Sequence, residues 1–329
     1  MKSQILKILK GNTQQYISGE VLSHQLGISR TAIWKYITML RKEGYYIASS
    51  SKKGYRLETI PNILSKEEVQ DGLDTIWIGK NIHCYESITS TNTIAKELAA
   101  KGCEAGTVVI ADQQTMGKGR RGRHWESPAG TGIWMSIVLR PNISPTEAPF
   151  LTILTALAVA KAIEEFVDVK PGIKWPNDII IGNKKACGIL TEMNAEIEMV
   201  NYVVIGIGIN VNMNEEDFPQ DIQAVATSLK EAIGKEVSRK LLLQSVLCKI
   251  EELYIQSIDE KIKSTLIEEY KKYSVTLGHK VKVIYPHREL EGEAMDLTSD
   301  GELIIKTSEG QTERIFSGEV SVRGILGYV

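Results

Sequence analysis

The sequence predicts an α+β chain of several domains, with an N-terminal winged helix-turn-helix, a central α/β domain and a C-terminal β-barrel of SH3-like type. The chain has 329 residues, which is too long for one compact hydrophobic core. The apolar pattern is helical at the N-terminus, mixes strands with long helices in the middle and ends in short alternating strands. We therefore expect domains at residues 1–60, 65–270 and 271–329.

The charge of the chain is unevenly distributed, although its net value is only −2. Residues 1–60 contain ten Lys and Arg against three Asp and Glu, a local charge of +7, so the remainder carries −9. Such a basic segment is typical of a surface that binds nucleic acid. The distribution of charge therefore indicates a partner that the net charge conceals.

The composition is that of a soluble globular protein and excludes disordered, collagen-like and disulfide-scaffold chains. The cysteines are too far apart for a C-x-x-C zinc or redox motif, so we expect free thiols in a reducing cytosol. They are Cys84, Cys103, Cys187 and Cys248. The N-terminus lacks a signal-peptide pattern, and the longest apolar stretch, 150–160, is far shorter than the roughly 20 residues that a membrane span requires. These features predict a cytoplasmic protein without a membrane partner.

The basic segment contains three predicted helices. Ser18 and Ser29 are suitable N-caps for helices that begin at residues 19 and 30, with the short turn Gly27-Ile28 between them. The residues expected to face inward recur at helical spacing. They are Ile5, Leu6, Ile8, Leu9, Val21, Leu22, Leu26, Ile33, Ile37 and Leu40. Helix, glycine-containing turn and helix form a helix-turn-helix pattern.

Two β-prone runs, 45–48 and 55–57, flank a Ser/Lys/Gly turn and predict a hairpin after the third helix, which is the position of a wing. The third helix and the wing present polar and basic side chains, which favours DNA binding in the major groove. The predicted contacts are Arg30, Thr31, Lys35, Lys52, Lys53 and Arg56. The alternative is a protein-interaction module with a solvated basic face. We interpret Trp34, beside the apolar stripe, as a residue at the edge of the core.

Polar residues Ser90, Thr91 and Asn92 open a predicted helix over 92–101. The unpaired backbone N–H groups of a helix N-terminus bind polar or anionic ligands. The alternative is that Ser90 or Thr91 only caps the helix, and the segment by itself favours capping.

A glycine-rich cationic segment follows a predicted buried strand over 108–111. Gly117, Gly119 and Gly122 fit G-x-G-x-x-G, but no helix follows and no acidic residue lies about 20 positions on, which excludes a dinucleotide fold. The Walker A pattern is also absent. Four cations within 118–123 instead favour a loop that binds a polyphosphate or another anion. A solvated basic loop or a nucleic-acid patch is the alternative.

Three further segments carry polar residues at the ends of predicted strands. Asn177-Asp178 follow a strand that stops at Pro176, Lys185 lies at the start of the returning strand of a hairpin, and Gly206 and Gly208 share one face of a strand. That bare face favours a ligand or a packed aromatic ring. We find no Ser/His/Asp or Cys/His pairing, so covalent catalysis through an enzyme nucleophile is not expected.

The C-terminal segment alternates between apolar and polar residues over 281–285, 303–306 and 319–323, with glycine turns between these runs. This pattern predicts a small, mostly antiparallel barrel of SH3-like type. It serves either as a cap on the central domain or as a contributor to its site.

Taken together and in this order, five motifs closely resemble those of the biotin–protein ligases. They are Ser90-Thr91-Asn92, Gln114 with Gly117–Arg123, Lys174–Asp178, Lys185–Leu190 and Gly206–Asn210. With the winged helix in front, the whole chain is similar to the bifunctional bacterial form, which is both ligase and repressor of the biotin operon. The resemblance implies a central domain of the biotin/lipoate-ligase type. Lipoate–protein ligase and a non-enzymatic, ligand-sensing repressor remain as alternatives.

The resemblance also implies the reaction and its partners. Biotin and ATP, with Mg²⁺, give biotinyl-5′-AMP, and the biotinyl group then passes to a lysine of a biotin carboxyl carrier protein. The adenylate-bound chain forms a homodimer that binds operator DNA.

The site residues follow from the same resemblance. Those expected to bind biotin are Ser90, Thr91, Asn92, Gln114, Lys118, Gly119, Arg120, Lys185 and Gly188. Those expected to bind ATP or the adenylate are Arg120, Arg121, Arg123, Trp125, Asn177, Asp178, Lys185, Asn210 and Arg323. Lys185 and Arg120 are the expected catalytic residues, Mg²⁺ is expected near Asp178, and Glu319 and Arg323 are expected to lean towards the site. Lys118 replaces the usual arginine, which keeps the charge but loses the bidentate guanidinium.

Overall fold

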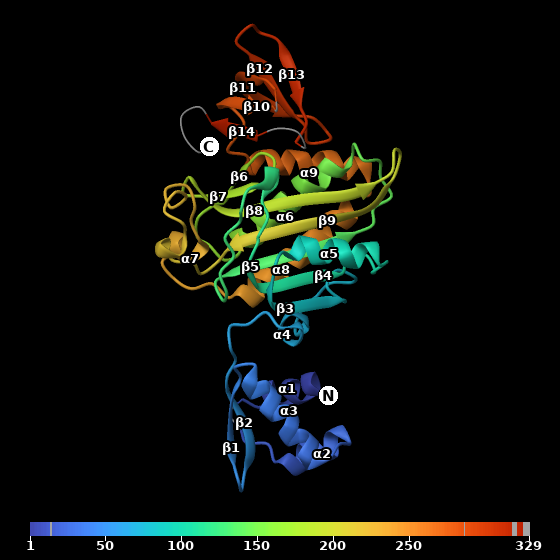
Figure 1. Ribbon diagram of the computed structural model, residues 1–329, viewed down its shortest axis with the longest axis vertical. Helices are drawn as coiled ribbons and strands as arrows, with labels where there is room; N and C mark the ends of the chain where they lie inside the picture. Colours follow the sequence, from blue (N-terminus) through green and yellow to red (C-terminus); the bar gives the residue numbers. More distant parts are fainter. Residues whose placement is uncertain (14, 286, 318–320, 325–329) are drawn as a thin grey trace. The chain divides into compact units, whose positions relative to one another are not determined.

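The computed structural model describes residues 1–13, 15–285, 287–317 and 321–324, and its helices and strands are labelled in Figure 1. Packing divides the chain into two compact units, Met1–Ile63 and Leu64–Val329. The central and C-terminal parts belong to the same compact unit, so a domain boundary near residue 270 stays a prediction.

The first unit is a winged helix-turn-helix. Its elements are α1 (Lys2–Lys10), α2 (Gly19–Leu26), α3 (Arg30–Lys42), β1 (Tyr46–Ser50) and β2 (Gly54–Thr59). The side chains of Ser18 and Ser29 accept hydrogen bonds from Val21 N and Ala32 N, which confirms both predicted N-caps. The two strands pair antiparallel and form the predicted hairpin.

Most of the predicted apolar stripe forms the core of this unit, but Val21 does not, and neither does Trp34, which was expected beside the stripe at the core edge. Val21 is 45% exposed and Trp34 is 56% exposed. Val21 directly precedes the fully buried Leu22, and Trp34 directly follows the fully buried Ile33. Adjacent residues of an α-helix are rotated by about 100°, so both side chains point away from the core. The inward orientation of Val21 and the core-edge position of Trp34 were therefore wrong predictions.

The second unit is built on a seven-stranded mixed sheet with the order β3-β4-β5-β9-β8-β7-β6. The strands are β3 (Ile82–Ile88), β4 (Val108–Gln114), β5 (Gly132–Leu139), β6 (Gly172–Lys174), β7 (Asp178–Ile181), β8 (Lys184–Ala195) and β9 (Val200–Asn210). Only β3 and β4 pair parallel, because α5 connects them as a crossover. The hairpin of β7 and β8 is the predicted one, with Asn183 at a φ of 66° in its turn.

Helices cover both faces of this sheet (Figure 1). The helices of this unit are α4 (Lys66–Gln70), α5 (Thr91–Ala100), α6 (Ala148–Glu164), α7 (Leu229–Ile233), α8 (Arg239–Gln256) and α9 (Glu260–Tyr273), with the 3₁₀ turns η1 (Arg120–Gly122) and η2 (Glu215–Asp217). Val108 and Ile110 belong to the large core that contains α6 and α8, whereas Val109 packs in a smaller cluster with α5. Alternation along β4 thus buries both of its faces.

The C-terminal part is a five-stranded antiparallel sheet in the order β13-β12-β11-β10-β14. Its strands are β10 (Lys280–Ile284), β11 (Glu289–Leu297), β12 (Leu303–Thr307), β13 (Thr312–Ile315) and β14 (Ser321–Gly324). The sequence predicted β10, β12 and β14 but missed β11 and β13, which are rich in charged residues. Glu319 lies outside the described residues. Among the described residues, no helix is long and apolar enough to cross a membrane.

Candidate active site

A cavity of about 430 Å³ lies on the α5 side of the sheet, between the N-terminus of α5, the loop after β4, and strands β6 to β9. The residues predicted to bind biotin, ATP or the adenylate all line it. They are Ser90, Thr91, Asn92, Gln114, Lys118, Gly119, Arg120, Arg121, Arg123, Trp125, Asn177, Asp178, Lys185, Gly188, Asn210 and Arg323. The predicted DNA contacts lie in the other unit.

One wall of the cavity is a buried polar network at the start of α5. Thr91 donates to Gln114 Oε1 from its backbone nitrogen at 2.8 Å and from its hydroxyl at 3.1 Å. Ser136 contacts the Thr91 hydroxyl at 2.7 Å and Asn92 Oδ1 at 2.6 Å. Ser90 is the N-cap residue but its side chain makes no capping hydrogen bond. Capping by Ser90 or Thr91 alone therefore does not explain this segment.

Two members of the network were missed from the sequence, Ser136 on β5 and Glu192 on β8. Glu192 accepts from Asn92 Nδ2 at 2.8 Å and from Lys96 Nζ at 2.6 Å. Burial raises the pKa of Glu192, but these hydrogen bonds and the nearby cations outweigh it, so the pKa lies below its ordinary value. A polar residue inside an apolar strand, as Ser136 is within 133–139, is the signal that was available.

The glycine face of β9 forms another part of the cavity wall. A Cβ atom at Gly206 would lie 2.1 Å from Asn92 Oδ1, and one at Gly208 would lie 2.5 Å from Trp125 Nε1. The prediction that this face holds a ligand or an aromatic ring is thus confirmed for the ring, since Trp125 packs there. Its buried indole N–H has no hydrogen-bond partner among the described residues. That donor is available to a ligand in the cavity.

The cationic loop runs over the mouth of the cavity. Arg120 donates to Asn177 Oδ1 at 2.8 Å and to the carbonyl oxygen of Ser317. Burial lowers the pKa of Arg120, because the surrounding protein replaces water around the guanidinium. Lys118 Nζ donates to Thr93 Oγ1 at 3.1 Å, so the unusual lysine contacts the first turn of α5. All four cations of the loop line the cavity. This position favours a loop that binds an anionic ligand over a basic loop that is only solvated.

The floor of the cavity holds a second group of cations. Lys185 Nζ lies 2.6 Å from Asp178 Oδ1 and 5.2 Å from the centre of the Trp125 ring. Lys174 is only 8% exposed, and burial lowers its pKa to about 8. The sequence analysis quoted Lys174 as part of a motif but did not assign it to the site. A buried lysine beside a cavity is a strong candidate for binding an anion.

Comparisons with known proteins bear directly on this site. The model of the "Biotin/lipoate A/B protein ligase family" matches residues 84–210, that of an "HTH domain" matches 2–56, and that of the "Biotin protein ligase C terminal domain" matches 276–323. The bifunctional ligase/repressor BirA of Bacillus subtilis is 38% identical over 98% of this chain and 98% of its own length. The chain belongs to the biotin protein ligase family. Like the bifunctional ligase/repressors of that family that match it over nearly its whole length, the chain carries a helix-turn-helix domain in front of the ligase domain.

Other biotin protein ligases agree in sequence and fold. BirA of Escherichia coli is 28% identical over 94% of both chains. The solved structure titled as the Aquifex aeolicus biotin protein ligase in complex with biotin and ATP is 33% identical. It covers 74% of this chain and 99% of its own, with a TM-score of 0.64. The relatives that match nearly the whole chain are named bifunctional ligase/repressors, which disfavours both a lipoate ligase and a repressor without ligase activity.

One part of this ligase's site was not apparent from the sequence. The segment after η2 closes one side of the cavity with apolar side chains, namely Phe218, Ile222, Val225 and Ala226. Lys185 N donates to Val225 O at 2.8 Å, and Asn210 Nδ2 donates to Thr227 O at 3.0 Å. These contacts fix the segment beside the strands that carry Lys185 and Asn210. The segment carries no glycine-rich or cationic pattern, so only the tertiary structure could assign it.

The acidic groups at the cavity bear on the expected metal. Within the described part of the chain, no group of three or more His, Cys, Asp or Glu residues is suited to hold a metal ion by itself. Asp178 and Asn177 provide side-chain oxygens at the cavity. That donor set fits Mg²⁺ bound chiefly through substrate phosphates, with one protein carboxylate.

Proposed function

We propose that this chain activates biotin with ATP to give biotinyl-5′-AMP and pyrophosphate, and then transfers the biotinyl group to one lysine of a biotin carboxyl carrier protein. The observation that carries the proposal is the convergence, in one cavity, of the polar network at α5 with the cations of the loop and of β6 to β8. The Aquifex aeolicus ligase, whose structure is titled with biotin and ATP, supports the two substrates.

The chemistry explains why cations surround this cavity. The carboxylate of biotin must attack the α-phosphorus of ATP, which brings two anions together. Lys185 and Arg120 are assigned to the carboxylate and phosphate oxygens, where charge develops as pyrophosphate leaves. Mg²⁺, when bound beside Asp178, would neutralise phosphate charge. The polar network of Thr91, Asn92 and Gln114 is assigned to biotin.

The product of the first step is a reactive mixed anhydride, so water must be kept away from it. The loop that carries Arg120 and Trp125 is suited to cover it, and an ordered loop commits the intermediate to transfer. In the second step the lysine amine of the carrier attacks the carbonyl carbon and AMP leaves. The enzyme needs no nucleophile of its own, in agreement with the sequence.

One experiment separates the candidate substrates. The purified chain is incubated with ATP, Mg²⁺, a carrier domain and either labelled biotin or labelled lipoate. We expect label on the carrier from biotin alone, with one AMP released for each transfer. Label from lipoate, or none from either compound, would contradict the proposal. Removal of Mg²⁺ with a chelator should abolish the first step.

We propose that the first unit represses transcription in the cytoplasm by binding a two-fold operator as a homodimer that forms on adenylate binding. Its support is the exposure of Arg30, Thr31, Lys35, Lys52 and Lys53 on α3 and the wing. Deletion of residues 1–63 should abolish operator binding and leave adenylate formation. Sedimentation with and without biotin and ATP tests the dimer, and an unchanged mass would contradict it.

A further inference from the structure

A fully buried arginine lies behind the cavity without lining it. Arg239 is the first residue of α8 and is 0% exposed. Its Nη1 atom donates to Asp112 Oδ1 at 3.0 Å and to the carbonyl oxygen of Gly132 at 3.1 Å. A buried guanidinium is costly unless it is paired, so a residue of this kind indicates a specific demand of the structure.

The two partners of Arg239 flank the cationic loop. Asp112 lies near the end of β4, and Gly132 is the first residue of β5. The backbone pairing of these strands ends at Ala111 and Trp134, so the strands separate where the loop of residues 115–131 leaves the sheet. The guanidinium of Arg239 therefore connects β4 and β5 just beyond the last backbone-paired residues of the two strands.

The loop between these partners carries the groups assigned to substrates, including Lys118, Arg120 and Trp125. A loop held at both ends has fewer conformations to lose when it closes on a ligand. We propose that Arg239 is a positioning residue that holds the two ends of the cationic loop in register for substrate binding. This inference rests on the proposed function of the cavity, and it deepens that function by adding a residue outside it.

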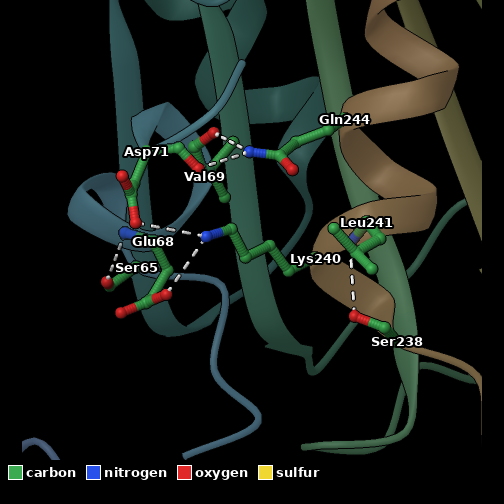
Figure 2. A network of polar contacts seen from close by, with 8 residues as sticks. All are labelled: Ser65, Glu68, Val69, Asp71, Ser238, Lys240, Leu241 and Gln244. Carbon is green, nitrogen blue, oxygen red and sulfur yellow. Dashed lines mark hydrogen bonds and ion pairs between the residues drawn. The ribbon is translucent and has the colours of Figure 1, made fainter. Parts of the chain in front are cut away.

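The next residue provides a matched control. Lys240 points towards α4 and the residue that follows it, where its Nζ lies 3.5 Å from Glu68 Oε2 and 3.5 Å from Asp71 Oδ2 (Figure 2). One turn later Gln244 Nε2 donates to the carbonyl oxygens of Val69 and Asp71 (Figure 2). Arg239 and Lys240 are therefore adjacent cations on the same helix, one bound to the ends of the loop and the other to α4.

The loop offers a readout that does not depend on the ligand. Trypsin cleaves after Lys and Arg, and the side chains of Lys118, Arg121 and Arg123 are exposed. We expect cleavage within 118–123 to be about tenfold faster in full-length Arg239→Met than in the wild type or in Lys240→Met. The KM for biotin should rise about tenfold in Arg239→Met, with a smaller fall in kcat, and Arg239→Lys should recover part of it.

Distinct outcomes decide the proposal. Unchanged loop cleavage and unchanged KM in Arg239→Met would overturn it. Equal changes in Arg239→Met and Lys240→Met, or faster cleavage throughout the chain, would also overturn it, because they indicate general destabilisation. If Arg239→Met does not fold, Asp112→Asn decides, since it weakens one anchor at a half-exposed side chain. Asp112→Asn should accelerate trypsin cleavage of the loop about threefold. An unchanged cleavage rate in this variant would count against the proposal. Failure of biotin activation in the wild type would refute the proposed function while the cleavage result still stands.

Discussion

The two units of the chain use their cations in opposite ways. In the first unit Arg30, Lys35 and Lys52 are exposed on α3 and the wing. In the second unit Arg120 and Lys174 are withdrawn from solvent at a cavity, where burial lowers the pKa of each. Exposed charges act at long range but are screened by salt, whereas buried charges act only on a ligand that enters. The same residue types are therefore suited to bind a polyanion at the surface of one unit and small anionic substrates in the cavity of the other.

The largest expected effect tests the exposed half of this comparison. Operator affinity should fall about 10³-fold between 50 and 200 mM salt, because several phosphates are neutralised. Adenylate formation should change no more than about threefold over the same range, because Arg120 and Lys174 are largely withdrawn from solvent and screened less by salt. Filter binding and pyrophosphate exchange measure the two quantities. A similar salt dependence of operator affinity and adenylate formation would contradict the contrast between the two units.

The next prediction concerns the cations at the cavity. Lys185→Ala should lower biotin-dependent pyrophosphate exchange by at least about 10²-fold, the scale of losing one transition-state electrostatic partner. Arg120→Ala should act on the same scale. Lys184→Ala is the matched control, because Lys184 points to Gln223 O and does not line the cavity. Turnover like that of the wild type in both site variants would refute the site.

A smaller effect is expected at the glycine face of β9. Gly208→Ala places a Cβ atom 2.5 Å from Trp125 Nε1, so the indole ring must move. We expect the KM for ATP to rise about tenfold while the melting temperature changes little, since the ring can shift towards the open cavity. Steady-state kinetics at varied ATP check this. An unchanged KM would show that the position of the ring does not matter to the nucleotide.

The smallest expected effect is at Glu192. Glu192→Gln keeps an acceptor for Asn92 but removes the negative charge beside Lys96. Since a hydrogen bond to a charged group contributes about 1 kcal/mol more than a neutral one, we expect biotin affinity to fall about fivefold at most. Calorimetric titration measures it. A loss as large as that of Lys185→Ala would mean that Glu192 contacts the substrate directly.

The sequence was most informative where local chemistry restricts the backbone. Ser18 and Ser29 predicted the starts of α2 and α3, and Gly206 with Gly208 predicted a strand that another group covers. It was least informative for strands of charged residues, since β11 and β13 have no apolar run that distinguishes them from loops. It also misplaced Val21, because a residue one position from a core leucine can lie on the outer face of a short helix.

By itself, the sequence determined the types of groups available: a basic winged helix, a glycine-rich cationic loop and polar residues at strand ends. Motif order was sufficient to indicate the family, because these groups are local and their spacing is written in the chain. Only the tertiary structure decided which of them meet. It brought residues 91, 136 and 192 into one network, buried Lys174 and placed Arg239 at the ends of the loop. Burial and long-range contacts determine the desolvation free energy and the pKa of a charged group. Neither follows from the spacing of the residues along the chain.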